Sequence, residues 1–161
     1  MNQPTAKLPT IYVDADACPV AVKDILFRTA IRLEIETIFV ANGTVRIPKS
    51  PFIKSIAVPH GANLADDRIV ELMSAGDLVI TNDVPLAARV VSKGGSAIGT
   101  RGERFDDDTV HARLATRDLM ESFRSAGIDT RGPKPQSGKD IQAFANLLDR
   151  TVTRMLKQAQ R

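Results

Sequence analysis

The sequence predicts an α/β fold, namely a three-layer α/β/α sandwich around a mainly parallel, Rossmann-like sheet of about five strands. Three observations support this prediction. Short apolar segments alternate with longer segments of helical periodicity, and the apolar segments are continuous runs, typical of strands that are buried on both faces. A third observation concerns size, because 161 residues with 43% hydrophobic content suffice for one compact domain, expected over 1–161.

Five apolar runs, bounded by Gly, Pro and Asn, predict the strands. They lie at 10–13, 37–41, 53–58, 78–81 and 97–98. The helices are expected between and after these runs, at 17–33, 66–75, from Pro85 onward, at 109–126 and over an apolar stripe from Ile141 to Leu156. Residues 131–138 contain two prolines and two glycines and therefore predict a loop. The C-terminal helices, about 106–158, are expected to pack on the sheet.

Composition excludes several classes of protein. Cys18 is the only cysteine, so an intramolecular disulfide and a cysteine-rich zinc site are both excluded. No apolar run approaches the ~20 residues of a membrane span, and residues 1–10 lack the apolar stretch of a signal peptide. We therefore expect a cytoplasmic protein without a membrane partner, in which Cys18 is a packed, inert thiol.

Charge is distributed unevenly along the chain. The net formal charge is −1 over residues 1–80 and +4 over residues 81–161, and most of the basic excess is arginine. This pattern fits a phosphate-binding surface in the second half, and it equally fits an ordinary solvated surface. The chain has no Trp and one Tyr, which disfavours a base-stacking platform for single strands.

Two aspartates follow the first predicted strand. Asp14 and Asp16 end the run Ile11-Tyr12-Val13, and a helix is expected to begin directly after them. An unpaired buried carboxylate costs several kcal/mol, so we place the pair at the open carboxyl end of the strand, where α/β proteins bind ligands. Asp16 fits the role of a helix cap, whereas capping leaves Asp14 unexplained.

Two further aspartates are expected at the same edge of the sheet. Asp83 follows the strand at 78–81, and Asp66 opens a helix. If the first and fourth strands are neighbours, these carboxylates converge with Asp14 and form a set of oxygen ligands suited to Mg²⁺ or Mn²⁺. The alternative is that Asp83 and one of the Asp66–Asp67 pair only cap helices. Asp77 opens a strand, faces the opposite edge and is excluded from the site.

Several motifs carry a family resemblance. They are Asp-Ala-Asp-Ala-Cys-Pro-Val at 14–20, Val-Ala-Asn at 40–42, Gly-Asp-Leu-Val-Ile-Thr-Asn-Asp-Val-Pro-Leu-Ala at 76–87, Arg-Gly-Glu-Arg-Phe at 101–105 and Gly-Pro at 132–133. Over nearly the whole chain they resemble the YaiI/YqxD family of uncharacterised bacterial proteins, which itself resembles PIN-domain nucleases. That likeness implies a single PIN-like domain with acidic residues that bind a divalent metal. Asp14, Asp66 and Thr81-Asn82-Asp83 match the PIN pattern.

The resemblance implies a metal-dependent nuclease that acts on RNA or single-stranded nucleic acid. Asp14 and Asp83 are then the principal metal ligands and catalytic residues, and Asp16 and Asp66 complete the site. Phosphate binding is assigned to Thr81, Arg101 and Arg104, although the two arginines would equally neutralise Glu103 and Asp106.

Two alternatives stay open. One is a non-catalytic module that binds metal or RNA through a degenerate site. The other is a haloacid dehalogenase-like phosphatase, in which Asp14 would be the nucleophile and Asp16 the acid/base. Two features count against the phosphatase. Cys18 stands where that superfamily has Thr or Val, and Gly76-Asp77 precedes a strand rather than following one.

Overall fold

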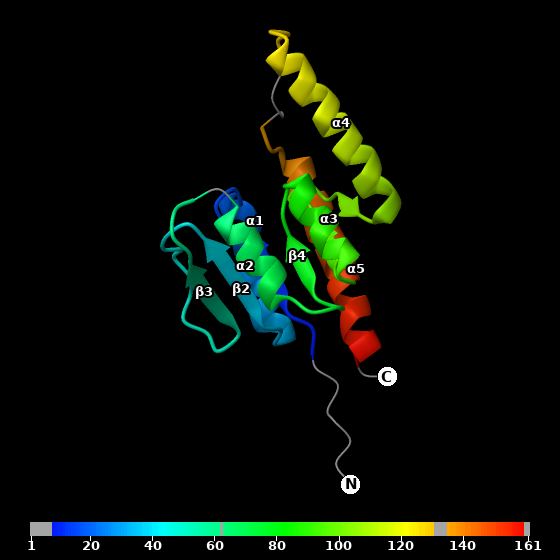
Figure 1. Cartoon of the computed structure of the whole chain (residues 1–161). Coiled ribbons are helices and arrows are strands. Elements are labelled where there is room, and N and C mark those ends of the chain that lie inside the picture. The colour runs from blue at the N-terminus through cyan, green and yellow to red at the C-terminus, as the bar shows by residue number, and fades with distance from the viewer. Residues whose placement is uncertain (1–7, 62, 131–134, 160–161) are drawn as a thin grey trace.

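A six-stranded sheet forms the middle layer of the molecule (Figure 1), and its strand order is β3-β2-β1-β4-β5-β6. The computed structural model describes residues 8–61, 63–130 and 135–159. The strands are β1 (Ile11–Asp14), β2 (Thr37–Ala41), β3 (Ile53–Ala57), β4 (Leu78–Ile80), β5 (Ser96–Ile98) and β6 (Arg104–Phe105). The first five are parallel, and β6 pairs antiparallel with β5. The predicted fold class is confirmed, with one short antiparallel strand added to the expected five.

Helices cover both faces of the sheet. They are α1 (Val20–Leu33), α2 (Leu64–Leu72), α3 (Val84–Ser92), α4 (Asp107–Ser125) and α5 (Gly138–Ala159). One face packs against α1 and α5, and the other packs against α2 and α3, with the first turns of α4 beside α3. None of these helices, within the ranges that the structure describes, is long and apolar enough to cross a membrane.

The strands are buried on both faces, as their continuous apolar runs predict. Ile11 and Val13 of β1 belong to the α1/α5 side of the core, and Tyr12 between them belongs to the α2/α3 side. Each fully buried aliphatic side chain contributes about 1.5–3 kcal/mol. By the same alternation, Asp14 continues on the α2/α3 side at the point where the strand reaches the surface.

Helix α1 begins later than the sequence predicts. Its N-cap is Pro19, which makes no side-chain capping hydrogen bond, and residues 15–18 form a turn instead of the first helical turn. The predicted capping role of Asp16 is therefore wrong. The reason is local, because Pro19 fixes its own φ and disfavours helical backbone at the residue before it.

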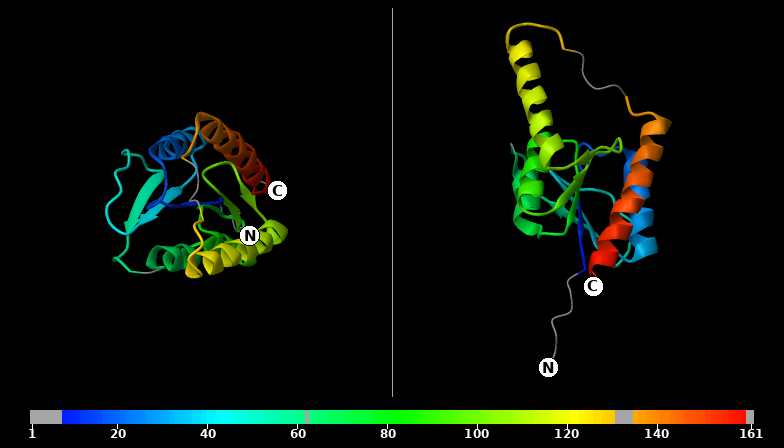
Figure 2. Two further views of the ribbon diagram at one scale, coloured as in Figure 1. Left: turned by 90° about the horizontal axis from the view of Figure 1, so that it is seen from above. Right: turned by 90° about the vertical axis from the view of Figure 1, so that its right-hand side faces the viewer.

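Two segments depart from a compact three-layer outline. The parallel strands β2 and β3 are joined by residues 42–52 without a helix, and Val45 and Ile47 of this crossover pack against the core. Helix α4 has one buried residue, Val110, and its second half extends past the sheet (Figure 2). Helix α5 instead buries its predicted stripe, including Phe144, Leu148 and Val152.

Candidate functional site

The candidate site lies where the sheet changes its direction of winding. Strand β1 is hydrogen-bonded to β2 on one side and to β4 on the other, so the first and fourth strands are neighbours as required. The chain leaves β1 for α1 on one face and leaves β4 for α3 on the other. Such a topological switch point opens a crevice at the carboxyl ends of the strands, the usual ligand site of α/β sheets. Asp14 and Asp83 therefore belong to adjacent strand ends.

A single hydroxyl group connects these two aspartates. Thr81 Oγ1 donates a hydrogen bond to Asp14 Oδ2 at 2.8 Å and accepts one from the backbone N–H of Asp83 at 2.9 Å. Asp83 in turn caps α3, because its Oδ1 accepts from the N–H of Leu86 at 2.8 Å. Thr81 is 1% exposed. Its hydroxyl is thus used to position Asp14, which leaves it unavailable for the phosphate contact predicted from the sequence.

Asp66 reaches the same edge from α2. Asn63 precedes this helix with a positive φ of 63°, a conformation that Asn tolerates better than most residues, and Asp66 and Asp67 follow in the first turn. Asp67 forms a salt bridge with Arg89 at 2.8 Å. Asp66 instead lies within range of the charges of Asp83 and Asp14. Burial, followed by the charges of Asp83 and Asp14, raises its pKa to about 6, although Arg89 opposes this rise.

Asp14 is also held in an unfavourable charged state. Burial is the main reason that its pKa is raised, the Thr81 hydrogen bond lowers it, and the charges of Asp83 and Asp16 raise it further. Among the described residues, neither Asp14, Asp66 nor Asp83 takes part in a salt bridge. Three elements therefore bring together carboxylates whose burial and charges raise the pKa of Asp14 and of Asp66, an arrangement typical of functional sites.

Asp16 has a different role from the one predicted. It is exposed, and both of its carboxylate oxygens accept from the backbone N–H of Asn42, at 3.1 and 3.0 Å. This contact fixes the turn after β1 to the end of β2. The side-chain Oδ1 of Asn42 is itself buried and accepts no hydrogen bond, which leaves an unused oxygen at the carboxyl edge.

The fit to a metal ion is partial. No group of three or more His, Cys, Asp or Glu side chains within the described ranges is arranged to hold a metal ion. The donor chemistry nevertheless suits a hard cation, because Mg²⁺ is usually held by one or two carboxylates and several waters rather than by a full protein cage. The residues present therefore fit a Mg²⁺ or Mn²⁺ bound through one or two aspartates.

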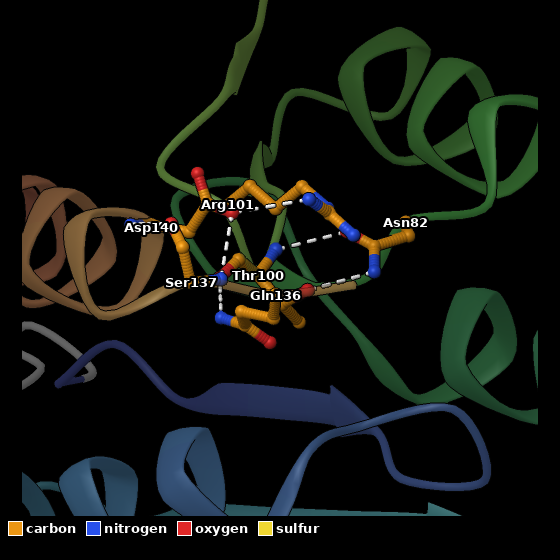
Figure 3. A network of polar contacts seen from close by, with 6 residues as sticks. All are labelled: Asn82, Thr100, Arg101, Gln136, Ser137 and Asp140. Carbon is orange, nitrogen blue, oxygen red and sulfur yellow. Dashed lines mark hydrogen bonds and ion pairs between the residues drawn. The ribbon is translucent and has the colours of Figure 1, made fainter. Parts of the chain in front are cut away.

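Of the two predicted arginines, Arg101 is already engaged. Arg101 forms a salt bridge with Asp140 at the start of α5, with 3.0 Å between Nη1 and Oδ2. Figure 3 shows this pair beside a second connection, in which Asn82 donates to Thr100 Oγ1 and accepts from the Thr100 N–H. Sequence reasoning missed this network, which ties the ends of β4 and β5 to α5. The only sequence feature that pointed to this network was the position of Asn82 directly after Thr81.

Arg104 lies on the other side of the sheet. It pairs with Ile98 across the β5–β6 ladder, and its side chain lines a hollow with Thr151 and Arg154 of α5. Of the two alternative partners, Glu103 is held by Arg113 at 2.6 Å. The pKa of Asp106 is lowered mainly by hydrogen bonds from Thr109 and also by the charge of Arg104. Arg104 is therefore not placed beside Asp14, because β6 turns its side chain toward α5.

Cys18 agrees with the expected inert thiol. It is buried, and burial raises its pKa to about 12, with a lowering by Lys23 and a further rise from Asp14. A thiol that stays protonated is a poor nucleophile. Cys18 lies in the short segment between β1 and α1, so the start of α1 lies next to the acidic edge.

Comparison with known proteins identifies the family. A family model described as uncharacterised BCR, YaiI/YqxD family, matches residues 12–154. The chain belongs to the YaiI/YqxD family. UPF0178 proteins are close relatives: one from Burkholderia lata is 55% identical over 144 residues, which is 89% of this chain and 96% of the relative. Another from Hydrogenovibrio crunogenus is 51% identical over 148 residues, covering 92% of this chain and 98% of the relative. No solved structure matches the chain.

Proposed function

We propose that this YaiI/YqxD family member binds Mg²⁺ or Mn²⁺ at the carboxyl edge of its sheet and hydrolyses phosphodiester bonds in RNA or single-stranded nucleic acid. The observation that carries the proposal is the convergence of Asp14, Asp66 and Asp83 at the switch point, where burial and neighbouring carboxylates raise the pKa of Asp14 and of Asp66. A divalent cation would relieve the repulsion between these carboxylates, and the three acids are those that the resemblance to PIN domains implies.

The proposed roles follow from the hydrogen bonds. Asp14 and Asp83 are the principal ligands, because Thr81 fixes the Asp14 carboxylate while leaving its Oδ1 without a hydrogen bond from any described residue. Asp66 approaches from α2, and Asp16 holds the neighbouring turn. A bound cation would lower the pKa of an attacking water and offset charge on the scissile phosphate.

A second candidate is a module that binds metal or RNA without catalysis. It is favoured by the lack, among the described side chains, of a ready group of three metal-binding residues. The phosphatase interpretation is disfavoured, because Asp77 is 2% exposed and its carboxylate accepts from the N–H groups of Thr10 and Ser74. These contacts hold it at the opposite edge of the sheet.

The test compares wild type with Asp14→Asn and Asp83→Asn on labelled RNA and on a phosphomonoester, with Mn²⁺ and with EDTA. Both variants should fold, since Asn still accepts from Thr81 and is as good a helix cap as Asp. Asp67→Asn is the matched control, because Asp67 lies beside Asp66 and pairs with Arg89. We expect metal-dependent RNA cleavage that falls at least about 100-fold in both site variants and persists in the control.

Three other outcomes would contradict the proposal. Equal cleavage by all proteins would indicate a contaminating nuclease. Release of phosphate from the monoester without RNA cleavage would support a phosphatase. RNA binding that is sensitive to salt, without cleavage, would support the non-catalytic module.

A further inference from the structure

A groove runs along α1 from the acidic edge. Its apolar lining comes from Val20 and Phe27 of α1 and from Ile47 and Pro48 of the crossover between β2 and β3. Its volume is about 540 Å³, within the about 300–1,000 Å³ typical of small-ligand pockets. Val20 is 72% exposed, which is unusual for a valine in a helix that packs on the core.

The groove begins at the same edge of the sheet as the candidate site. Val20 is the first residue of α1, directly after the turn that carries Asp16. The crossover begins at Asn42, whose N–H binds the Asp16 carboxylate. The groove therefore starts beside the turn that follows β1, the strand that ends at Asp14.

The charges of the groove favour an anion. Lys23 and Arg46 line it, together with the acidic Asp24. Neither cation takes part in a salt bridge with any residue in the described part of the chain, whereas most arginines elsewhere in the structure do. The crossover at 42–52 carries Arg46 and Lys49 and no acidic residue. Unpaired cations beside an apolar lining suit a ligand with both a phosphate and a flat apolar group.

We propose that this groove binds one unpaired nucleoside of a single strand, next to the scissile phosphate. The base lies against Val20, Phe27 and Ile47, and Lys23 and Arg46 contact the flanking phosphates. The inference rests on the proposed function and deepens it, because a groove that accepts a base selects single strands over duplexes. Bases in duplexes are stacked and paired, and extruding one costs a few kcal/mol.

Binding is measured by fluorescence anisotropy of a labelled single-stranded oligonucleotide in EDTA, where metal-dependent cleavage is absent. Val20→Glu places a negative charge in the groove without loss of packing, and Glu in the first turn of a helix is favourable for folding. We expect affinity to fall about tenfold. Ile31→Glu is the matched control, because Ile31 is 50% exposed on the same helix but lines a different hollow.

The cations are tested by the double variant Lys23→Gln, Arg46→Gln. Loss of two phosphate contacts should reduce the slope of log affinity against log salt by about 1.4. The control is Arg28→Gln, Arg32→Gln, which removes the same charge from α1 at the hollow shared with α5. An equal reduction of this salt-dependence slope in both double variants would overturn the inference, because the effect would then come from the net charge of the protein and not from the groove.

An abasic strand tests whether a base occupies the groove. Wild type should bind it more weakly than the intact strand, and Val20→Glu should lose less affinity for it than for the intact strand. The inference is overturned if Val20→Glu binds the intact strand as tightly as wild type, or if duplex binds as tightly as single strand. Cleavage that depends on Asp14 would then still support the proposed function. Groove-dependent binding without cleavage would instead support this inference and contradict the nuclease.

Discussion

The two edges of the sheet hold aspartates beside the same pair of strands, but their surroundings differ. At the amino edge, Asp77 precedes β4 and is buried, and its two oxygens accept from the backbone N–H groups of Thr10 and Ser74 at 3.0 and 2.8 Å. At the carboxyl edge, Asp14 ends β1 and is half-buried. It receives one hydrogen bond, from Thr81, and is opposed by the charges of Asp83 and Asp16.

The difference lies in what surrounds each carboxylate. Asp77 is surrounded by donors that belong to the folded backbone, so its charge stabilises the connection between residue 10 and β4. Asp14 is surrounded by other acids, so its charge destabilises the fold unless a cation is supplied. One edge therefore contributes to stability, the other carries the proposed binding site, and the following substitutions test that division.

The largest effect is expected at Asp77. Asp77→Ala leaves two buried backbone N–H groups without an acceptor, and each hydrogen bond to a charged group is worth about 1.5–3 kcal/mol. We expect the free energy of unfolding to fall by about 3–5 kcal/mol, measured by urea denaturation. Asp77→Asn retains one acceptor and should lose about half as much. A loss below 1 kcal/mol for the Ala variant would remove the contrast between the edges.

Divalent metal should stabilise the protein through Asp14. If the cation binds only the folded state, a concentration about 100-fold above its Kd adds about 2.7 kcal/mol of stability. Mn²⁺ should therefore raise the melting temperature of wild type and leave Asp14→Asn unchanged. Asp77→Asn is the control here, and it should respond to Mn²⁺ despite its lower starting stability. A full response in Asp14→Asn would exclude Asp14 as a ligand.

The stability of the metal-free protein should depend on pH through Asp66. Its pKa is about 6 when folded, against an ordinary value of 3.8, so the folded state binds more protons between these values. The stabilisation is complete below about pH 3.8 and is lost as the pH rises through about 6. After allowance for screening, Asp66→Asn should add about 1–2 kcal/mol at pH 7. An unchanged slope of stability against pH in this variant would contradict the assignment.

The smallest effect is expected at Thr81. Thr81→Val keeps the buried volume but removes the donor to Asp14 and the acceptor for the Asp83 N–H, at a cost of about 1 kcal/mol. Thr81→Ser keeps the hydroxyl and should stay within about 0.5 kcal/mol of wild type. The Val variant should also weaken the Mn²⁺ response, because the Asp14 carboxylate loses its fixed orientation. Identical thermal shifts in both variants would show that Thr81 is only a packing residue.

The sequence predicts the sheet and the meeting of Asp14 with Asp83 because both depend on local patterns. Continuous apolar runs identify parallel strands, and the carboxyl ends of parallel strands share one edge. The site then requires only that β1 and β4 are neighbours. Asp66 could be placed because a helix that starts after a strand of the same sheet begins at that edge.

Residues whose roles depend on distant partners could not be predicted. Arg101 binds Asp140, 39 positions away, and Asp16 binds the N–H of Asn42, 26 positions away. Strand β6 has only two residues, too few to show an alternation of polar and apolar side chains. The orientation of Arg104 toward α5 could therefore not be predicted from the sequence. Thr81 was predicted to bind phosphate because the sequence shows that it carries a hydroxyl, but the sequence does not show that this hydroxyl is buried.

Helix α5 has a consequence for how the protein folds. Phe144, Leu148 and Val152 pack in the same cluster as Ile11 and Leu26, so the last helix of the structure completes a core begun by the first strand and helix. During synthesis this face of the sheet stays open until the chain has reached α5. Contacts of such long sequence separation slow folding and leave apolar surface exposed to aggregation in the meantime. A nascent chain that ends before α5 should therefore depend on chaperones.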